Sequence, residues 1–367
     1  MIVPQDSGKT DLYQKREERF IMRVLTVNAE GKLAFAQVPR PLPNDYQALV
    51  RMRSCGVCNG TDTKLIHRTF KNFSAYPAIL GHEGVGEVVE CGKRVRSMAV
   101  GDLVLLPFLE EPVDGFAPGW GAYAEYALVG DAAAYEHDGL LVPSEGYFAQ
   151  TVLKKSDHVD AVSASMIITF REVLSAIRRF GFQPNQNVVV FGAGPVGLCF
   201  TKFSKLLGMT NVVTVDIYDQ KVAEARCMGA DLAFNSTKTD IVPALRAVFP
   251  EGVDYVVDAV GINALINQAM ELVSYNGKIC CYGISPQLGM ELDWSKAPYN
   301  WTLQFVQWPS KKEEADAHSQ IMAWINSGVL NPMDFISHVF PFENAMEPFE
   351  KIERRDPDIK KMVIAFP

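Results

Sequence analysis

The stretch that decides the fold is Val188-Val-Val-Phe-Gly-Ala-Gly-Pro-Val-Gly197, in which an apolar strand pattern runs directly into a glycine-rich turn. In this GxGxxG spacing, Gly192 permits a tight turn and Gly194 lets the backbone approach a ligand closely. Gly197 allows the following helix to pack closely on the strand. The stretch therefore predicts a strand, a phosphate-binding turn and a helix in succession.

Pro195 and Val196 lie where the turn leads into the next helix, and the unpaired N–H groups at the start of that helix favour a phosphate. The next predicted strand, Val212–Val215, ends at Asp216, 19 residues after the motif. A carboxylate there accepts hydrogen bonds from ribose hydroxyls and repels a 2′-phosphate. The pattern predicts a dinucleotide site that prefers NAD, although Lys221 lies nearby and would weaken the preference. The alternative is a glycine-rich turn that binds nothing.

Outward from the turn, predicted strands and helices alternate strictly after Pro184, which is typical of a doubly wound parallel sheet. A long helix, Met166–Phe180, precedes this region. The strands are Val188–Phe191, Val212–Val215, Tyr255–Val257 and Lys278–Tyr282, and the helices between them are Val196–Leu207, Asp219–Met228, Ile241–Val248 and Ala264–Leu272.

Short strand-like runs separated by Gly and Pro occupy residues 22 to about 129 and predict a mostly antiparallel β domain. The tail adds two helices and a last strand, so we expect the nucleotide domain (176–314) to be inserted into a catalytic domain (22–175 and 315–367), with residues 1–21 as an N-terminal extension. The runs are Arg23–Val27, Ala48–Met52, Val85–Val89, Asp102–Leu106 and Ala124–Val129, followed in the tail by helices near Ala315–Asn326 and Glu343–Arg354 and a strand near Lys361–Phe366.

Composition limits the classes of function. A chain of 367 residues with 48% hydrophobic residues can bury a sizeable core, and its net charge of -8 disfavours nucleic acid and acidic membrane surfaces as partners. No apolar stretch is long enough to span a bilayer, and the N-terminus lacks a signal-peptide pattern. Seven cysteines are an odd number at low density, which argues against a disulfide framework. We expect a cytoplasmic protein with a small-molecule substrate.

Two segments of the β domain contain residues that can bind a metal. The first runs from Cys55 through Cys58 to Thr61 and Asp62, and the second is Gly81-His-Glu-Gly-Val-Gly86. A thiolate, an imidazole and a carboxylate are ligands of catalytic Zn(II), which keeps one position open for substrate. These segments therefore make a zinc site a hypothesis.

The run from His82 to Val95 resembles the zinc-site signature of the medium-chain zinc-dependent alcohol and polyol dehydrogenases, the family that includes sorbitol and threonine dehydrogenases. GDLVLLP after it, the glycine motif at mid-chain and KMVIAF at the end occur in the order typical of that family. The resemblance implies a Rossmann-type domain inserted in a GroES-like catalytic domain, hydride transfer between a secondary alcohol, polyol or sugar derivative and NAD, one catalytic zinc ion, and a homodimer or homotetramer.

The same resemblance implies a role for each site residue. Cys58 and His82 correspond to the family's thiolate and imidazole ligands, and Glu83 to the carboxylate that binds or flanks the zinc. Asp62 corresponds to the carboxylate that orients the ligand histidine, and Thr61 to the hydroxyl that receives the substrate proton.

This chain departs from the family pattern in three places. Asn59 and Gly60 lengthen the loop before Thr61 by one residue. Lys64 stands where a relay histidine is common, with His67 three residues further on. Polyol dehydrogenases carry another ligand where this chain has Ile168, and completion by Glu83, Glu172, Cys55 or water stays open.

The remaining residues with chemical potential are weaker candidates. Trp120, Phe108 and Trp301 could line a substrate cleft, and we expect the loops at 108–122 and 294–308 to determine the pocket. Because no cysteine lies between Cys91 and Cys199, a second, structural zinc is excluded. We expect Cys199, Cys227, Cys280 and Cys281 to be core residues. Two alternative functions remain, a zinc-free reductase of activated alkenes or quinones and a non-catalytic NAD-binding protein.

Overall fold

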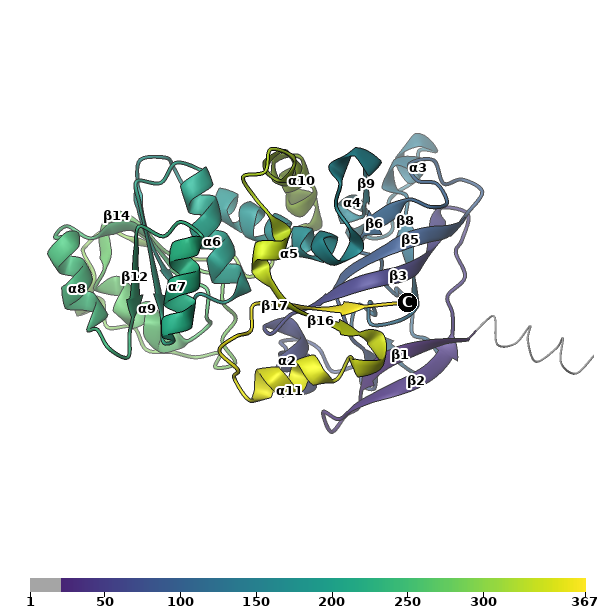
Figure 1. Ribbon diagram of the computed structural model, residues 1–367, viewed down its shortest axis with the longest axis horizontal. Helices are drawn as coiled ribbons and strands as arrows, with labels where there is room; N and C mark the ends of the chain where they lie inside the picture. Colours follow the sequence, from purple (N-terminus) through teal and green to yellow (C-terminus); the bar gives the residue numbers. More distant parts are fainter. Residues whose placement is uncertain (1–20) are drawn as a thin grey trace, which may run out of the picture.

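The computed structural model describes residues 21–367, so the predicted N-terminal extension, apart from Ile21, lies outside the described residues. Figure 1 shows a parallel sheet with its helices on the left and a β-rich domain on the right. The C-terminal strand β17 (Lys361–Ala365) lies in the β-rich domain beside β3 (Gln47–Val57), although the two strands are far apart in sequence. The division of the chain at residues 175/176 and 314/315 stays a prediction.

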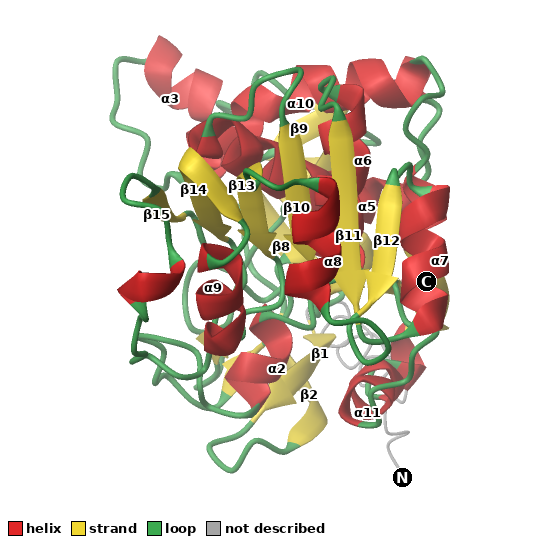
Figure 2. Cartoon of the chain, turned by 90° about the vertical axis from the view of Figure 1, so that its left-hand side faces the viewer, coloured by secondary structure: helices red, strands yellow, loops and turns green. Residues whose placement is uncertain are grey.

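The parallel sheet, in the region predicted to bind a dinucleotide, has six strands in the order β12-β11-β10-β13-β14-β15. The strand order reverses between β10 and β13, and ligands of doubly wound sheets bind beside the carboxyl ends of strands at such a point. Four of the strands were predicted, whereas β12 and β15 were missed. Figure 2 shows the strands side by side; their bounds are β10 (Asn187–Phe191), β11 (Asn211–Asp216), β12 (Leu232–Asn235), β13 (Val253–Asp258), β14 (Val273–Cys281) and β15 (Thr302–Phe305).

Helices cover both faces of this sheet because its strands are apolar on both sides. Val188 and Val190 pack in the same buried cluster as α5 and α6, whereas Val189 and Phe191 pack with α8 and α9. The helices are α5 (Ala161–Phe180), α6 (Pro195–Leu206), α7 (Asp219–Cys227), α8 (Ile241–Val248) and α9 (Asn263–Met270). The predicted doubly wound domain is confirmed.

The β-rich domain contains two sheets that are mostly antiparallel. The larger has the order β16-β17-β3-β5-β6-β9 with β8 also paired to β3, and the smaller has the order β2-β1-β4-β7. Its other strands are β1 (Ile21–Val27), β2 (Leu33–Pro39), β4 (Ala78–Ile79), β5 (Glu83–Cys91), β6 (Leu103–Leu105), β7 (Ala117–Pro118), β8 (Tyr126–Gly130), β9 (Thr151–Leu153) and β16 (Ile336–Pro341).

The long helix α5 joins the two domains. Asp160 caps its first turn by accepting from the backbone N–H of Ser163, and Gly181 ends it in the left-handed region at φ 77°. Its partner α10 (Lys311–Asn326) begins four residues earlier than predicted, because Ser310 and Glu313 form a capping box.

The shorter helices are α2 (Thr61–Ile66), α3 (Ala132–His137), α4 (Gly146–Ala149) and α11 (Glu347–Glu353). The predicted helix over 343–354 is therefore two elements, a 3-10 turn at Phe342–Asn344 followed by α11. Among the described helices, none has the length and apolar character required to cross a membrane.

Candidate active site

The three predicted zinc ligands converge. One ligand atom from each of Cys58, His82 and Glu83 lies within 4.8 Å of the others. Cys58 follows β3, whereas His82 and Glu83 stand at the start of β5, which pairs with β3. Strand pairing therefore brings together two segments that are 24 residues apart in the sequence.

The imidazole of His82 lies between two acidic groups. Its Nδ1 is 3.5 Å from Asp62 Oδ1, and its Nε2 is 3.9 Å from Glu83 Oε1. Burial lowers the pKa of His82, but its contacts with Asp62 and Cys58 outweigh that effect and raise the pKa well above its ordinary value. The surroundings of this imidazole thus favour a positive charge, whether a proton or a metal ion supplies it.

Asp62, which the sequence analysis predicts to orient His82, lies beside the imidazole. It is fully buried, and its Oδ2 accepts from the backbone N–H of Cys58 at 3.0 Å and from the Tyr123 hydroxyl at 2.6 Å. Its Oδ1 and His82 Nδ1 are buried and have no other partner among the described residues. Such a carboxylate fixes the histidine so that Nε2 can face a metal.

Glu83 has a second partner that the sequence analysis did not identify. Lys361, in β17, donates to both carboxylate oxygens at 2.7 and 2.6 Å, and the Thr169 hydroxyl donates to Oε1 at 3.2 Å. Both Glu83 and Lys361 are buried. A Cβ at Gly56 would lie 2.2 Å from Glu83 Oε2, so the glycine leaves room for this ion pair.

The alternatives for a further ligand lie outside the three-residue cluster. Ile168 is a fully buried residue of α5, and Cys55 is buried in a core cluster of the β-rich domain. Glu172 is half-buried rather than on the helix surface, yet it is not one of the clustered residues. Burial and the neighbouring Glu314 raise the pKa of Glu172 to about 7.

The proton-relay candidates Thr61, Lys64 and His67 each have a different partner. Thr61 is buried beside Cys58, because its backbone N–H donates to Cys58 Sγ at 3.4 Å. Lys64 donates to the backbone carbonyl of Gly60. His67 forms an exposed pair with Glu353 at 2.8 Å, away from the clustered ligands.

The glycine-rich turn has the geometry that the motif predicts. A Cβ at Gly197 would lie 1.9 Å from the carbonyl oxygen of Gly192, so the helix cannot tolerate a side chain there. Gly192 itself has φ 97° and would meet Val260 after β13. At Gly194, the N-cap of α6 before Pro195 and Val196, a Cβ would have nothing within 4 Å. The position predicted to approach a ligand is therefore open.

Asp216 ties the turn to the end of β11. Its Oδ2 accepts from the backbone N–H of Ala193 at 2.7 Å, and its Oδ1 accepts from the backbone N–H groups of Ile217 and Tyr218. Lys221 points elsewhere, because it donates to Glu224 Oε2 at 2.7 Å and to the carbonyl of Ile359.

Comparison with known proteins identifies the family. Residues 44–140 match the family described as alcohol dehydrogenase GroES-like domain, and residues 195–316 match zinc-binding dehydrogenase. An alcohol dehydrogenase from Geobacillus stearothermophilus is 32% identical over 72% of this chain and 77% of its own length. The chain belongs to the zinc-type medium-chain alcohol and polyol dehydrogenase family.

Other relatives extend the likeness over most of the chain. Sorbitol dehydrogenase from Ovis aries is 26% identical over 89% of this chain and 92% of its own length. Among solved structures, an oxidoreductase/dehydrogenase of unknown specificity from Escherichia coli superposes with a TM-score of 0.79 at 21% identity, covering 95% of this chain and 99% of that one. The GroES-like and Rossmann-type architecture is thereby confirmed.

Three aromatic residues were predicted to line the substrate pocket, and of these Trp120 contacts the candidate ligand set in the described part of the chain. Its ring centroid is 5.5 Å from that of His82. Phe108 packs against the core cluster that contains α5, and Trp301 packs against Trp294. The rings of Phe70 and Trp308, which the sequence analysis did not single out, contact Trp120 instead.

The cysteines outside the site follow the prediction with one exception. All seven are free thiols, and Cys199, Cys280 and Cys281 are buried. Cys227 is exposed at the end of α7, so its assignment to the core was wrong. The last two residues of this helix, Arg226 and Cys227, are exposed, whereas Ala225 before them is buried.

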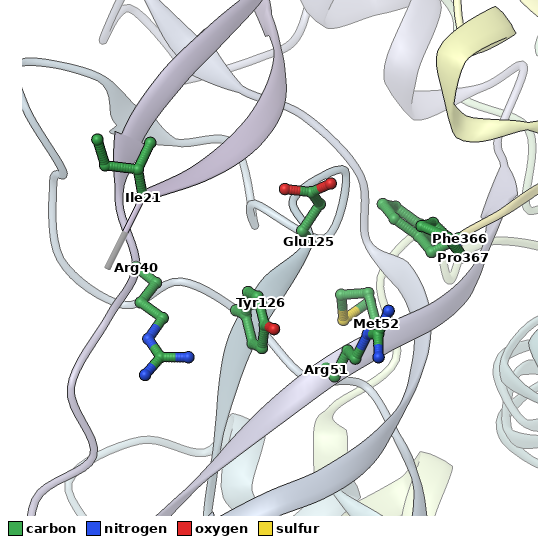
Figure 3. Close-up of a pocket in the computed structure, with 8 residues that line it drawn as sticks. All are labelled: Ile21, Arg40, Arg51, Met52, Glu125, Tyr126, Phe366 and Pro367. Atoms are coloured by element: carbon green, nitrogen blue, oxygen red, sulfur yellow. The ribbon is translucent and has the colours of Figure 1, made fainter. Parts of the chain in front are cut away.

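A cavity elsewhere in the catalytic domain has a volume of about 370 Å³ (Figure 3). Arg40, Arg51, Glu125 and Tyr126 are among the residues that line it, and none of the predicted site residues does. It is therefore separate from the ligand cluster.

Proposed function

We propose that the protein is an NAD-dependent zinc alcohol dehydrogenase that oxidises a CH–OH group of a small-molecule alcohol. Cys58, His82 and Glu83 would hold one zinc ion. The observation that carries the proposal is the convergence of their three ligand atoms within 4.8 Å. This convergence favours a zinc enzyme over a zinc-free reductase, which would have no need of a thiol, an imidazole and a carboxylate in one place.

The choice of NAD rests on the acidic strand end. The carboxylate of Asp216 lies beside the turn that would bind the pyrophosphate, and Lys221 is committed to Glu224 and Ile359. Replacing Asp216 with Ser should lower the preference for NAD over NADP about tenfold or more, since hydrogen bonds to a charged group contribute roughly 1.5 to 3 kcal/mol. The substitution also removes the hydrogen bond between Asp216 and the backbone N–H of Ala193. Because that loss affects both cofactors, it cancels in the ratio of the two kcat/KM values measured on one preparation. A wild type that prefers NADP would contradict the assignment.

The reaction transfers a hydride from the carbinol carbon to the nicotinamide and releases the hydroxyl proton, so atoms and electrons balance. A bound zinc would supply a Lewis acid that lowers the pKa of the substrate hydroxyl. Asp62 would keep His82 in the orientation that presents Nε2. Thr61, held against Cys58 by its backbone N–H, would receive the released proton. Because His67 is paired with Glu353, the proton path beyond Thr61 would not use that histidine.

The direct test is a screen for NAD reduction over simple alcohols, polyols, cyclitols and amino alcohols, with zinc supplied. We expect turnover that a chelator abolishes and added zinc restores. Chelator-resistant reduction of a quinone or activated alkene would favour the zinc-free reductase. NAD binding without turnover on any of these substrates would favour the non-catalytic protein. A cytoplasmic location and a homodimeric or homotetrameric state stay predictions.

A further inference from the structure

Three aromatic side chains form a continuous wall beside the candidate zinc ligands. We define the aromatic wall as Phe70, Trp120 and Trp308. The ring of Trp120 lies 5.7 Å from that of Phe70 and 5.5 Å from that of Trp308, while Phe70 and Trp308 are 6.3 Å apart. Because Trp120 also contacts His82, the wall begins at the ligand set itself.

The two domains both contribute to this wall. Phe70 follows α2 in the catalytic domain, and Trp120 lies in the loop before β8. Trp308 stands between β15 and α10, where the chain leaves the nucleotide-binding sheet. A molecule that reaches both the zinc ligands and a nicotinamide would therefore lie against these rings.

The position of Trp120 is enforced by its backbone. Trp120 has φ 66°, an unusual conformation for a bulky residue, and the next residue, Gly121, has φ 80°. On either side of the pair, Gly119 donates to the carbonyl of Ile79 at 2.8 Å and Ala122 donates to that of Gly81 at 2.8 Å. Since Gly81 directly precedes His82, the turn that carries Trp120 is bonded to the segment that carries the ligand.

The wall is apolar and only partly covered. Trp308 is 47% exposed, so part of its surface remains open to a ligand. Among residues 21–367, the cation that lies over these rings is Lys311, 5.5 Å from the centroid of the Trp308 ring. Lys311 already donates to both carboxylate oxygens of Glu314, at 2.8 and 2.9 Å. Flat apolar rings bind flat apolar groups, whereas an open-chain polyol requires several hydrogen-bonding partners.

We propose that the aromatic wall selects alcohols that carry an aryl or other flat apolar group next to the carbinol carbon over open-chain polyols. This inference rests on the proposed zinc dehydrogenase activity and names its substrate class. Trp308 and Trp120 are specificity-determining residues in this account, and neither binds the metal or the dinucleotide.

The test compares kcat/KM for 1-phenylethanol with that for sorbitol in the zinc-loaded protein with NAD. The variants are Trp308→Ala, Trp120→Leu and, as a matched control, Trp294→Ala, which removes an exposed tryptophan that packs against Trp301 outside the wall. We expect the wild type to prefer 1-phenylethanol by at least tenfold. Each wall variant should lose about tenfold of this preference, mainly through a higher KM for 1-phenylethanol, because contacts between aromatic rings stabilise binding beyond the area that they bury.

The ratio of kcat/KM for the two alcohols does not change when part of a preparation is misfolded. Trp308 is also exposed enough that replacing it should leave no cavity in the core. An unchanged ratio in Trp294→Ala would support the proposal. A wild type that prefers sorbitol, or wall variants that keep the wild-type ratio, would overturn it. If the protein oxidised sorbitol but not 1-phenylethanol, the proposed dehydrogenase activity would stand and the proposed selectivity of the aromatic wall would be wrong. If it oxidised neither alcohol in a zinc-dependent reaction, both proposals would be wrong.

Discussion

The nucleotide-binding turn and the metal-ligand cluster differ in where their parts come from along the chain. The turn draws its glycines and Asp216 from 25 consecutive residues, 192–216. The cluster combines residues after β3 and at the start of β5 with Thr169 from α5 and Lys361 from β17. A site built by one strand–turn–helix unit depends on local geometry, whereas the cluster depends on the whole catalytic domain being assembled.

The largest effect that this comparison predicts is in the cluster. His82→Ala and Cys58→Ser should each weaken zinc binding more than about 100-fold, beyond the roughly 10- to 100-fold cost typical of residues that only support ligands. Turnover should fall nearly to zero, while NAD affinity stays within a factor of about two because the turn lies in the other domain. Zinc content and NAD titration of the same preparations test this. If a single substitution abolished the binding of both zinc and NAD, the metal-ligand cluster and the glycine-rich turn would not be independent.

The converse experiment substitutes glycines in the glycine-rich turn and leaves the metal-ligand cluster unchanged. Gly197→Ala should destabilise the nucleotide domain and weaken NAD binding, because its Cβ would overlap the Gly192 carbonyl at 1.9 Å. Gly194→Ala is the matched change: its methyl meets nothing within 4 Å, so it should leave the melting temperature unchanged and still weaken NAD binding. Both variants should keep zinc. Normal NAD binding in Gly194→Ala would mean that the dinucleotide does not approach this position.

A smaller effect on zinc affinity should show whether Glu83 binds the zinc ion itself or only supports the residues that do. Glu83→Gln should lower zinc affinity about 10- to 100-fold or more, whereas Glu172→Gln should leave it nearly unchanged. Because the first change also leaves buried Lys361 without its anion, the double variant Glu83→Gln/Lys361→Met serves as the control. Zinc affinity is measured in a buffered free-zinc series. Wild-type affinity in the double variant would show that Glu83 acts only as the partner of Lys361, and loss in Glu172→Gln would place the ligand on α5.

The smallest predicted effect is on stability and concerns Glu172. Its pKa is raised from 4.5 to about 7 by burial and Glu314, so the folded protein holds a proton that the unfolded chain releases. Stability should fall as the pH rises through this window. In zinc-free protein, Glu172→Gln should gain about 1 to 3 kcal/mol in the free energy of unfolding at pH 8 and nothing at pH 4. The exposed Glu343→Gln should show no such dependence. Equal gains in stability at pH 4 and pH 8 would contradict the raised pKa of Glu172.

The same contrast explains what the sequence could predict. The glycine turn, the parallel strands around it and the candidate zinc ligands Cys58 and His82 all have local signatures in the sequence. Strand pairing then explains why the two candidate ligands converge. Lys361 belongs to the quoted KMVIAF motif, but nothing in that motif predicts its bond to Glu83, which joins residues 278 positions apart. The role of Trp308 could not be predicted from the sequence either, because its contact with Trp120 forms only when the two domains pack together. The short strand β12 was missed because Leu232–Asn235 has only four residues and little alternation.

The most direct test of the zinc assignment is anomalous X-ray diffraction at the zinc absorption edge, from crystals of protein grown with zinc and no chelator. The account predicts a single strong anomalous peak within bonding distance of Cys58 Sγ and His82 Nε2, roughly 2.0 to 2.3 Å from each. A carboxylate oxygen of Glu83 should lie in or next to the coordination shell. No peak at this position, or a peak bound by other residues while Cys58 and His82 stay metal-free, would contradict it.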